Sequence, residues 1–217
     1  MEGARLAAHD IACRRGDRLL FAGLSFELGA GDALQVTGAN GTGKSSLIRI
    51  LAGLLRPFSG SLERGGDIAL LDGNLPLDAH LPLGKALGFW EKIDRPRVSA
   101  VDDGLAALAD VPVRFLSTGQ RKRAAVLQSN PAANAIWLLD EPASGLDPRS
   151  FDRFVTLLRD YAKRGITICI IEHNLDIVIK LSDRVAFLDQ GKLLAQGSSE
   201  DILKDPHLAA IYFGERA

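Results

Sequence analysis

The chain has 217 residues, a length that suits one domain, or a domain with a subdomain, and that is ample to bury a hydrophobic core. Its 26 basic and 27 acidic residues leave a net charge of -1, so nothing supports a nucleic-acid surface and no nucleic-acid partner is expected. The first residues do not resemble a leader, and the longest apolar run, 166–171, is too short to cross a bilayer. A soluble chain is therefore expected, and any role at a membrane would need a partner.

The two cysteines, Cys13 and Cys169, lie far apart in apolar, strand-like stretches without metal-ligand spacing. Buried, reduced thiols in a reducing compartment are therefore expected. Neither a disulfide nor a zinc site is expected.

The N-terminal region, residues 5–36, reads as a series of short strands. Apolar residues alternate at Leu24, Phe26 and Leu28 before a turn signal at 29–32. A small antiparallel sheet is expected here.

Residues 38–45 match the phosphate-binding pattern G-x-x-x-x-G-K-[ST] at every fixed position, between a predicted strand and a predicted helix. Its glycines let backbone N–H groups surround an anion at the positive end of the helix. Lys44 is expected to contact the β- and γ-phosphates, and Ser45 to bind Mg²⁺. A chance glycine-rich turn is the alternative, which the flanking strand and helix disfavour. The residues expected to bind the nucleotide are Gly38, Ala39, Asn40, Gly41, Thr42, Gly43, Lys44, Ser45 and Ser46.

After this loop, apolar residues at helical spacing predict a helix that reaches Leu55 and ends at 57–60. A strand is predicted at 67–71. Residues 72–115 are rich in Pro, Gly and Asp, with helical pieces at 85–91 and 99–109, the second opened by a Ser-x-x-Asp cap. This region is interpreted as a helical insertion in the sheet.

Leu116–Gln120 precede a basic, helix-forming run at 121–123. On these residues alone, Ser117 and Gln120 favour a helix N-cap with a capping box. A helix that starts with Ser-Gly can also bind an anion, so a cap and an anion-binding role depend on the same N–H groups at the helix start. The basic run is expected to form a solvated helix face.

Ile136–Glu141 is an apolar run that ends in two carboxylates, as expected of a buried parallel strand whose end faces a ligand. Asp140 is expected to hold Mg²⁺, and Glu141 to polarise the water that attacks the γ-phosphorus. An acidic turn after a core strand is the alternative. Asp147 then caps a predicted helix that begins at Pro148 and ends at Gly165.

A further buried strand at 166–171 delivers Glu172 and His173 to the same edge of the sheet. A lone histidine is more often structural than catalytic. This one leaves a parallel strand at the place expected for the γ-phosphate, which favours a catalytic role.

Together these motifs resemble those of an ABC-type ATPase subunit. Residues 38–45 match the Walker A loop, and 116–120 resemble the signature loop LSGGQ with a threonine in place of one glycine. Residues 136–141 match Walker B, 144–147 resemble the D-loop, and His173 resembles the switch histidine. The order and spacing of the motifs cover nearly the whole chain.

The resemblance implies an α/β fold, a P-loop NTPase of ABC type with a mainly parallel core sheet. It further implies an N-terminal antiparallel β subdomain and a short helical subdomain at about 74–130, within a single ATP-binding domain over 1–217.

The resemblance also implies an ATPase that uses ATP and Mg²⁺, with Glu141, His173 and Lys44 as catalytic residues. It implies a head-to-tail, ATP-dependent homodimer in which Ser117 and Gly119 of one copy close over the ATP held by Lys44 of the other. Membrane-spanning transporter subunits would be its partners, on the cytoplasmic face of the inner membrane.

Two positions depart from the family pattern. Where a Q-loop glutamine would stand, the chain has Asp72-Gly73-Asn74, which leaves the usual Mg²⁺ and coupling contact without its residue. Where an adenine-stacking aromatic would stand, it has Arg14-Arg15. An arginine plane can stack on adenine, so Arg15 is the candidate.

The subfamily resemblance is mixed. Residues from about 5 to 142 resemble the ATP-binding subunit of the cytochrome c biogenesis haem exporter, and residues from about 143 to 217 resemble the branched-chain amino-acid importer ATPase. The larger share favours haem export. The importer ATPase and a nucleotide-switched module that works without a membrane are the alternatives; relatives of the last kind typically carry paired ATPase domains or a coiled-coil insertion, which this chain lacks.

Overall fold

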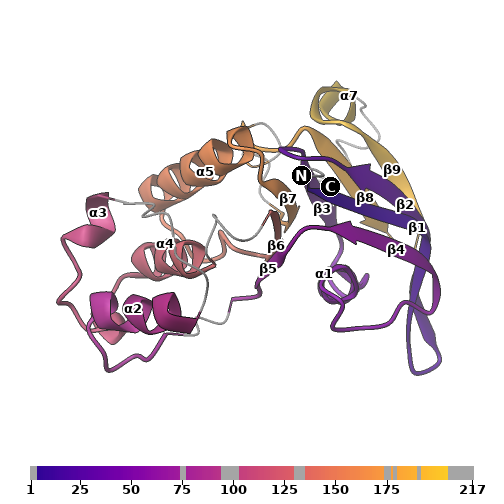
Figure 1. Cartoon of the computed structure of the whole chain (residues 1–217). Coiled ribbons are helices and arrows are strands. Elements are labelled where there is room, and N and C mark those ends of the chain that lie inside the picture. The colour runs from indigo at the N-terminus through magenta and orange to yellow at the C-terminus, as the bar shows by residue number, and fades with distance from the viewer. Residues whose placement is uncertain are drawn as a thin grey trace.

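The computed structural model describes residues 4–73, 77–93, 103–129, 135–173, 177, 180–189 and 192–204. The strands in these ranges are β1 (Arg5–Arg15), β2 (Arg18–Leu28), β3 (Ala33–Gly38), β4 (Ser59–Gly65), β5 (Ile68–Leu71), β6 (Ile136–Asp140), β7 (Thr167–Ile171), β8 (Arg184–Asp189) and β9 (Lys192–Ser198). The helical elements are α1 (Lys44–Leu51), α2 (Leu83–Ile93), α3 (Asp103–Ala106), η1 (Val113–Phe115), α4 (Thr118–Gln128), α5 (Pro148–Lys163) and α7 (Ser199–Lys204). The strands form one sheet in the order β4-β1-β2-β9-β8-β3-β7-β6-β5, with α2 to α5 gathered on one side of it (Figure 1).

The strands β5, β6, β7, β3 and β8 form a parallel core. Every residue of β3 and β7 is buried, and so is all of β6 except its last residue. Continuously buried strands are typical of a parallel sheet that is covered on both faces. The predicted α/β fold with a mainly parallel core is confirmed. Because Asp140 lies opposite Ile171, the carboxyl ends of β6 and β7 meet at the same edge.

The N-terminal strands form the predicted antiparallel sheet, in which β1 pairs with β2 and with β4. Leu24, Phe26 and Leu28 are all buried, as their alternation predicts. The expectation of short strands throughout 5–36 is wrong, because β1 and β2 have 11 residues each. The segment 33–36 also leaves this antiparallel sheet. It is buried on both faces as part of β3, and it joins the parallel core.

Three strands, β4, β8 and β9, are absent from the sequence-based interpretation. Each residue of β4 is exposed or half-buried, so the strand has no apolar alternation to detect. β8 lies beside β3, with Leu34 opposite Arg184, and β9 pairs with β8 in antiparallel orientation. Both depend on partners from distant parts of the chain, which a local pattern does not reveal.

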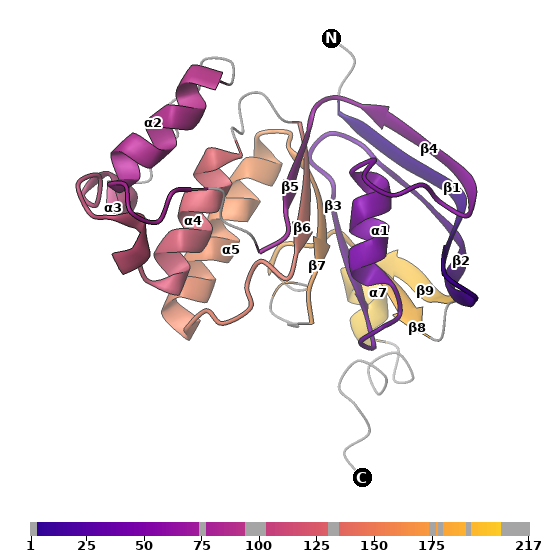
Figure 2. The same cartoon turned by 90° about the horizontal axis from the view of Figure 1, so that it is seen from below.

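Alternate residues of the parallel strands pack against helices on opposite faces of the sheet. Leu138 shares a cluster with Leu47 and Ile50 of α1, whereas Trp137 shares another with Phe154 of α5. Figure 2 shows α1 on one side of β5, β6 and β7, with α4 and α5 on the other. The sheet thus separates α4 from the start of α1.

The helix α1 is shorter than predicted. It ends at Leu51, and Gly53 adopts a left-handed φ of 79° while its N–H donates to the carbonyl oxygen of Ile50 (2.9 Å). A glycine in this conformation ends a helix readily. Leu54, expected on the apolar face, is 69% exposed.

Residues 72–115 contain helices, as predicted. α2 contains the predicted helix at 85–91, and α3 falls within the one predicted at 99–109, whose Ser99 cap lies outside the described residues. These helices share a hydrophobic cluster with η1 and α4. Its buried members are Leu77, Leu83, Ala86, Leu105, Val113, Leu116 and Ala124.

Cys13 and Cys169 are buried and free, as predicted. Burial raises the pKa of Cys169 to about 12, so its thiol stays protonated. No helix in the described part of the chain is both long and apolar enough to span a bilayer.

The close approach of β3 to β8 generates a stability prediction. Gly38 has a φ of 139°, and a Cβ there would overlap the carbonyl oxygen of Leu188. We expect Gly38→Ala to lower the free energy of unfolding by about 3 kcal/mol, through steric overlap and backbone strain. Urea unfolding without nucleotide measures this change.

Gly41→Ala is the matched control for this substitution. Gly41 has a φ of 79° and nothing within 4 Å of a Cβ, so only the left-handed strain of about 1–2 kcal/mol is expected. Equal losses in the two variants would contradict the steric explanation.

Candidate nucleotide site

The phosphate-binding loop connects β3 to α1. Gly38, Gly41 and Gly43 have φ values of 139°, 79° and 101°, which side chains rarely allow. Gly43 is the N-cap of α1 and makes no side-chain cap, so the first N–H groups of the helix are not satisfied by a side chain. Ala39 and Asn40 are exposed at the loop's tip. The loop thus has the geometry of an anion site at a helix N-terminus.

Lys44 is 6% exposed, and its ammonium lies within this loop. Its Nζ donates to the carbonyl oxygens of Gly38 (2.8 Å) and Ala39 (2.9 Å), and the Thr42 hydroxyl also donates to Ala39 (2.9 Å). Burial lowers the pKa of Lys44, while the charges of Glu141 and Asp140 raise it. A cation is therefore held at the place predicted for phosphates.

The predicted Mg²⁺ ligands, Ser45 and Asp140, lie near each other. Burial raises the pKa of Asp140, and the neighbouring Ser45 side chain lowers it. A hydroxyl and a carboxylate are hard oxygen donors of the kind that Mg²⁺ prefers, and Mg²⁺ usually takes few protein ligands beside substrate phosphates. In the described residues there is no group of three or more His, Cys, Asp or Glu that could hold a metal. The pair fits a Mg²⁺ ion that is shared with a nucleotide.

Glu141 and His173 also meet at this edge. Nε2 of His173 lies 3.6 Å from Oε1 of Glu141, and each side chain is about half exposed. Glu141 has a φ of 48°, unusual for a non-glycine residue, and its N–H donates to the carbonyl oxygen of Ile171 (3.0 Å). Burial lowers the pKa of His173, as does the charge of Lys44, against the opposing effect of Glu141. The neutral imidazole is favoured.

The signature residues lie elsewhere. The Ser117 side chain accepts from the N–H of Gln120 (3.2 Å), whose side chain accepts from the N–H of Ser117 (2.8 Å), so the predicted capping box is confirmed. Gly119 is buried, and a Cβ there would lie 2.7 Å from the Ser150 hydroxyl. The helix that Ser117 caps, α4, lies on the opposite side of the sheet from α1, which begins at Lys44 (Figure 2).

The end of β1, which carries Arg15, lies near the start of α1. Burial raises the pKa of Cys13, while the nearby Ser46 side chain and the charge of Arg15 lower it. Arg15 is itself exposed. The neighbouring Arg14 has its guanidinium 4.6 Å from the centroid of the Phe58 ring. Arg15 is therefore close to the loop.

The segment in the place of the Q-loop follows β5. Gly73 has a φ of 85°, so a glutamine at this position would have to adopt a left-handed conformation. The other candidate, Asn74, lies outside the described residues.

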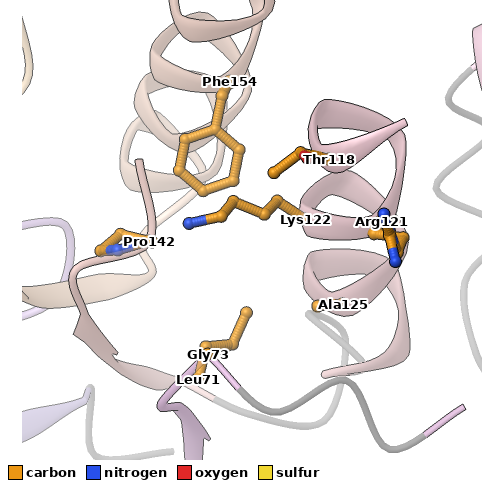
Figure 3. A pocket seen from close by; sticks show the side chains of 8 residues that line it. All are labelled: Leu71, Gly73, Thr118, Arg121, Lys122, Ala125, Pro142 and Phe154. Carbon is orange, nitrogen blue, oxygen red and sulfur yellow. The ribbon is translucent and has the colours of Figure 1, made fainter. Parts of the chain in front are cut away.

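A pocket of about 280 Å³ lies between α4 and the ends of β5 and β6 (Figure 3). It is lined by Leu71, Gly73, Thr118, Arg121, Lys122, Ala125, Pro142 and Phe154.

The prediction of a solvated basic face is wrong for Lys122, which points into this pocket. Its Nζ donates to the carbonyl oxygen of Glu141 (3.2 Å), and burial lowers its pKa. Helical spacing could have found this residue, because it stands three after buried Gly119 and four before buried Val126.

Glu172 is a second residue that the sequence interpretation left without a role. It is 6% exposed. Its carboxylate accepts from the N–H groups of Ala143 (2.6 Å) and His173 (3.3 Å). Its position between a buried strand and a candidate catalytic histidine was the only available signal.

Comparisons with known sequences agree with this geometry. A family model described as ABC transporter matches residues 21–144. The chain is 53% identical over 174 residues to the cytochrome c biogenesis ATP-binding export protein CcmA of Novosphingobium aromaticivorans, covering 80% of this chain and 91% of that protein. It is 50% identical over 176 residues to the protein of the same name from Zymomonas mobilis, covering 79% of each.

Solved structures show the same fold. The chain superposes with a TM-score of 0.80 and 25% identity on cbiO1 of Clostridium perfringens, described as part of the ABC transporter complex cbiONQ; the match covers 94% of this chain and 92% of that one. A nucleotide-free ATP-binding cassette from an ABC transporter gives the same TM-score at 23% identity, covering 98% and 100% of the two chains.

The buried ammonium of Lys44 generates a binding prediction. We expect Lys44→Ala to weaken ATP binding by about tenfold to a hundredfold, because charge-assisted hydrogen bonds to phosphate are lost. Fluorescent-nucleotide titration measures the affinity. Lys85→Ala, on the exposed side of α2, is the control and should bind ATP as the parent does. Unchanged affinity in the Lys44 variant would contradict the assignment of the loop.

Proposed function

Because the chain belongs to the ABC transporter family, we propose that it is the ATP-hydrolysing subunit of an exporter in cytochrome c biogenesis, with haem as the exported compound. As a member of this family the chain binds nucleotide and couples ATP hydrolysis to transport. The proposal for the hydrolytic site is carried by one observation, the meeting of Lys44, Asp140, Glu141 and His173 where β3, β6 and β7 end. The assignment to cytochrome c biogenesis rests on the relatives' names.

The residues have distinct proposed roles. Bound Mg²⁺, held by Ser45 and Asp140, would neutralise charge on the phosphates. The ammonium of Lys44 exchanges its two carbonyl acceptors for β- and γ-phosphate oxygens. Glu141 accepts a proton from the attacking water, and His173 beside it orients the γ-phosphate end. Each role uses a group that this edge of the sheet already presents.

The remaining nucleotide contacts come from the loop and from Arg15. Backbone N–H groups of residues 38–46 surround the phosphates. The Arg15 guanidinium stacks on adenine from the end of β1, near Ser46. The effect of Ser46 on the pKa of Cys13 supports this placement, because it puts this part of β1 near the start of α1.

The proposed assembly is a head-to-tail homodimer. Ser117 and Gly119 lie across the sheet from Lys44 in one copy, so closure over ATP requires a second copy. Family members work with membrane transporter subunits. We place this chain on the cytoplasmic face of the inner membrane, as one ATP-binding domain over 1–217 with a helical subdomain at about 74–130.

The role of Glu141 is tested by Glu141→Gln. Without a general base, ATP turnover should fall by about two to four orders of magnitude, with ATP affinity unchanged. Phosphate release and nucleotide titration measure the two quantities. Glu63→Gln, at an exposed carboxylate of β4, is the control and should keep parental turnover. Hydrolysis retained in the Glu141 variant would rule out this assignment.

The proposed dimer is tested with the same variant. Because unhydrolysed ATP would join the two copies, Glu141→Gln with ATP should shift from monomer to dimer, whereas the chain without nucleotide stays mainly monomeric. Light scattering measures the mass. Adding Ser117→Arg should abolish the shift by blocking the interface. A dimer that forms equally with ADP would argue for another use of the signature loop.

A further inference from the structure

We infer that Glu172 is a positioning residue, which holds the segments carrying Glu141 and His173 in their mutual geometry, and that Lys122 acts with it from α4. This inference rests on the proposed ATPase function and concerns two residues to which that function assigns no role. Neither residue is proposed to touch the reacting atoms.

The carboxylate of Glu172 joins its own segment, which follows β7, to the turn that follows β6. Oε1 accepts from the N–H of Ala143, at 2.6 Å, in the turn that follows Glu141. Oε2 accepts from the N–H of His173, at 3.3 Å, in the segment that follows β7. One side chain thus connects the turn of the candidate base with the candidate switch histidine.

The backbone of Glu172 is itself fixed to β3. Its carbonyl oxygen accepts from Nε2 of Gln35 (2.8 Å), and its N–H donates to the carbonyl oxygen of Val36 (3.4 Å). Gln35 is fully buried in the strand that leads into the phosphate-binding loop. Glu172 therefore connects the ends of β3, β6 and β7, the three strands that form the site.

Lys122 holds the same turn from the other side. Its Nζ donates to the carbonyl oxygen of Glu141 at 3.2 Å, while the N–H of Glu141 donates to Ile171. Hydrogen bonds at the N–H and at the carbonyl oxygen of Glu141 thus hold its uncommon φ. Since the carboxylate of Glu141 lies 3.6 Å from the His173 ring, a small rotation of this turn would separate them.

The electrostatics agree with a positioning role. Burial raises the pKa of Glu172, whereas the N–H groups of Ala143 and His173 and the charge of Lys122 lower it. A buried carboxylate is costly, and an apolar side chain of similar size would pack here at less cost. What an apolar side chain lacks is the ability to accept from two N–H groups at once.

The test is Glu172→Gln in the 217-residue chain. Glutamine has the same size but only one acceptor oxygen, so its NH₂ group faces either the N–H of Ala143 or that of His173, and the paired, charge-assisted bonds of the carboxylate are lost. We expect kcat to fall by about tenfold to a hundredfold, with KM for ATP within about twofold of the parent. Asp152→Asn, an acid-to-amide change at an exposed site of α5, is the control and should leave both constants unchanged.

Lys122→Met provides the second variant. It keeps the length of the side chain and removes the donor to Glu141, and we expect kcat to fall at least about threefold with KM unaltered. If the two residues act on one turn, the double variant should lose less than the product of the single losses. Independent losses that multiply would contradict the joint role.

A lower melting temperature in Glu172→Gln with parental kcat would make the residue merely structural and would overturn the inference. Should Glu172→Gln fail to fold, parental kcat in Lys122→Met has the same consequence. Lack of hydrolysis in the parent chain would instead refute the proposed function, so the two failures are distinguishable.

Discussion

Parallel pairing of β3, β7 and β6 is the constraint on which the candidate site depends. Parallel strands place their carboxyl ends at one edge, and only a sheet that is covered on both faces keeps such strands buried. In this chain α1 covers one face, and α5 with α4 covers the other. The loops that leave the three strands carry Lys44, Glu141 and His173, residues far apart in the sequence. Strand register brings these segments together, and the hydrogen bonds of Glu172 to Gln35 and Ala143 hold them there.

Side chains of opposite charge meet at the same edge, where they are partly buried. Burial lowers the pKa of Lys44 against the charges of Glu141 and Asp140, and it raises the pKa of Asp140 against the effects of Ser45 and the charge of Arg49. The buried Lys44 and Glu172 also have hydrogen-bonding partners, two for each charged group. Such an arrangement is preorganised for a charged ligand, because the cost of orienting these dipoles is already met in folding.

The sheet also explains why one copy holds only part of the proposed machinery. The signature residues begin α4, on the face opposite α1, and Gly119 packs tightly against Ser150. Only glycine allows that approach of α4 to α5. The pocket lies beside α4, and Lys122, which lines it, connects this helix with the turn after β6. Within one chain, therefore, α4 contacts the turn that carries Glu141, and this contact does not depend on a second copy.

The sequence alone determined those features whose physics is local. The phosphate-binding loop, the capping box at Ser117 and the cap at Asp147 each depend on residues within a few positions, and the buried parallel strands follow from apolar runs. The end of α1 is local as well, because the left-handed Gly53 ends the helix before the proline at which the sequence pattern places its end.

Only the tertiary structure decided the features that depend on partners distant in the chain. β4 and β8 become strands because β1 and β3 pair with them, although β4 has no apolar alternation of its own. Lys122 reads as a surface residue until the turn after β6 is placed beside α4. Glu172 reads as one more carboxylate until the turn after β6 presents the N–H of Ala143 to it, beside that of its neighbour His173. Hydrogen bonds and pKa values depend on what surrounds a group in space, and a linear pattern records only what is adjacent along the chain.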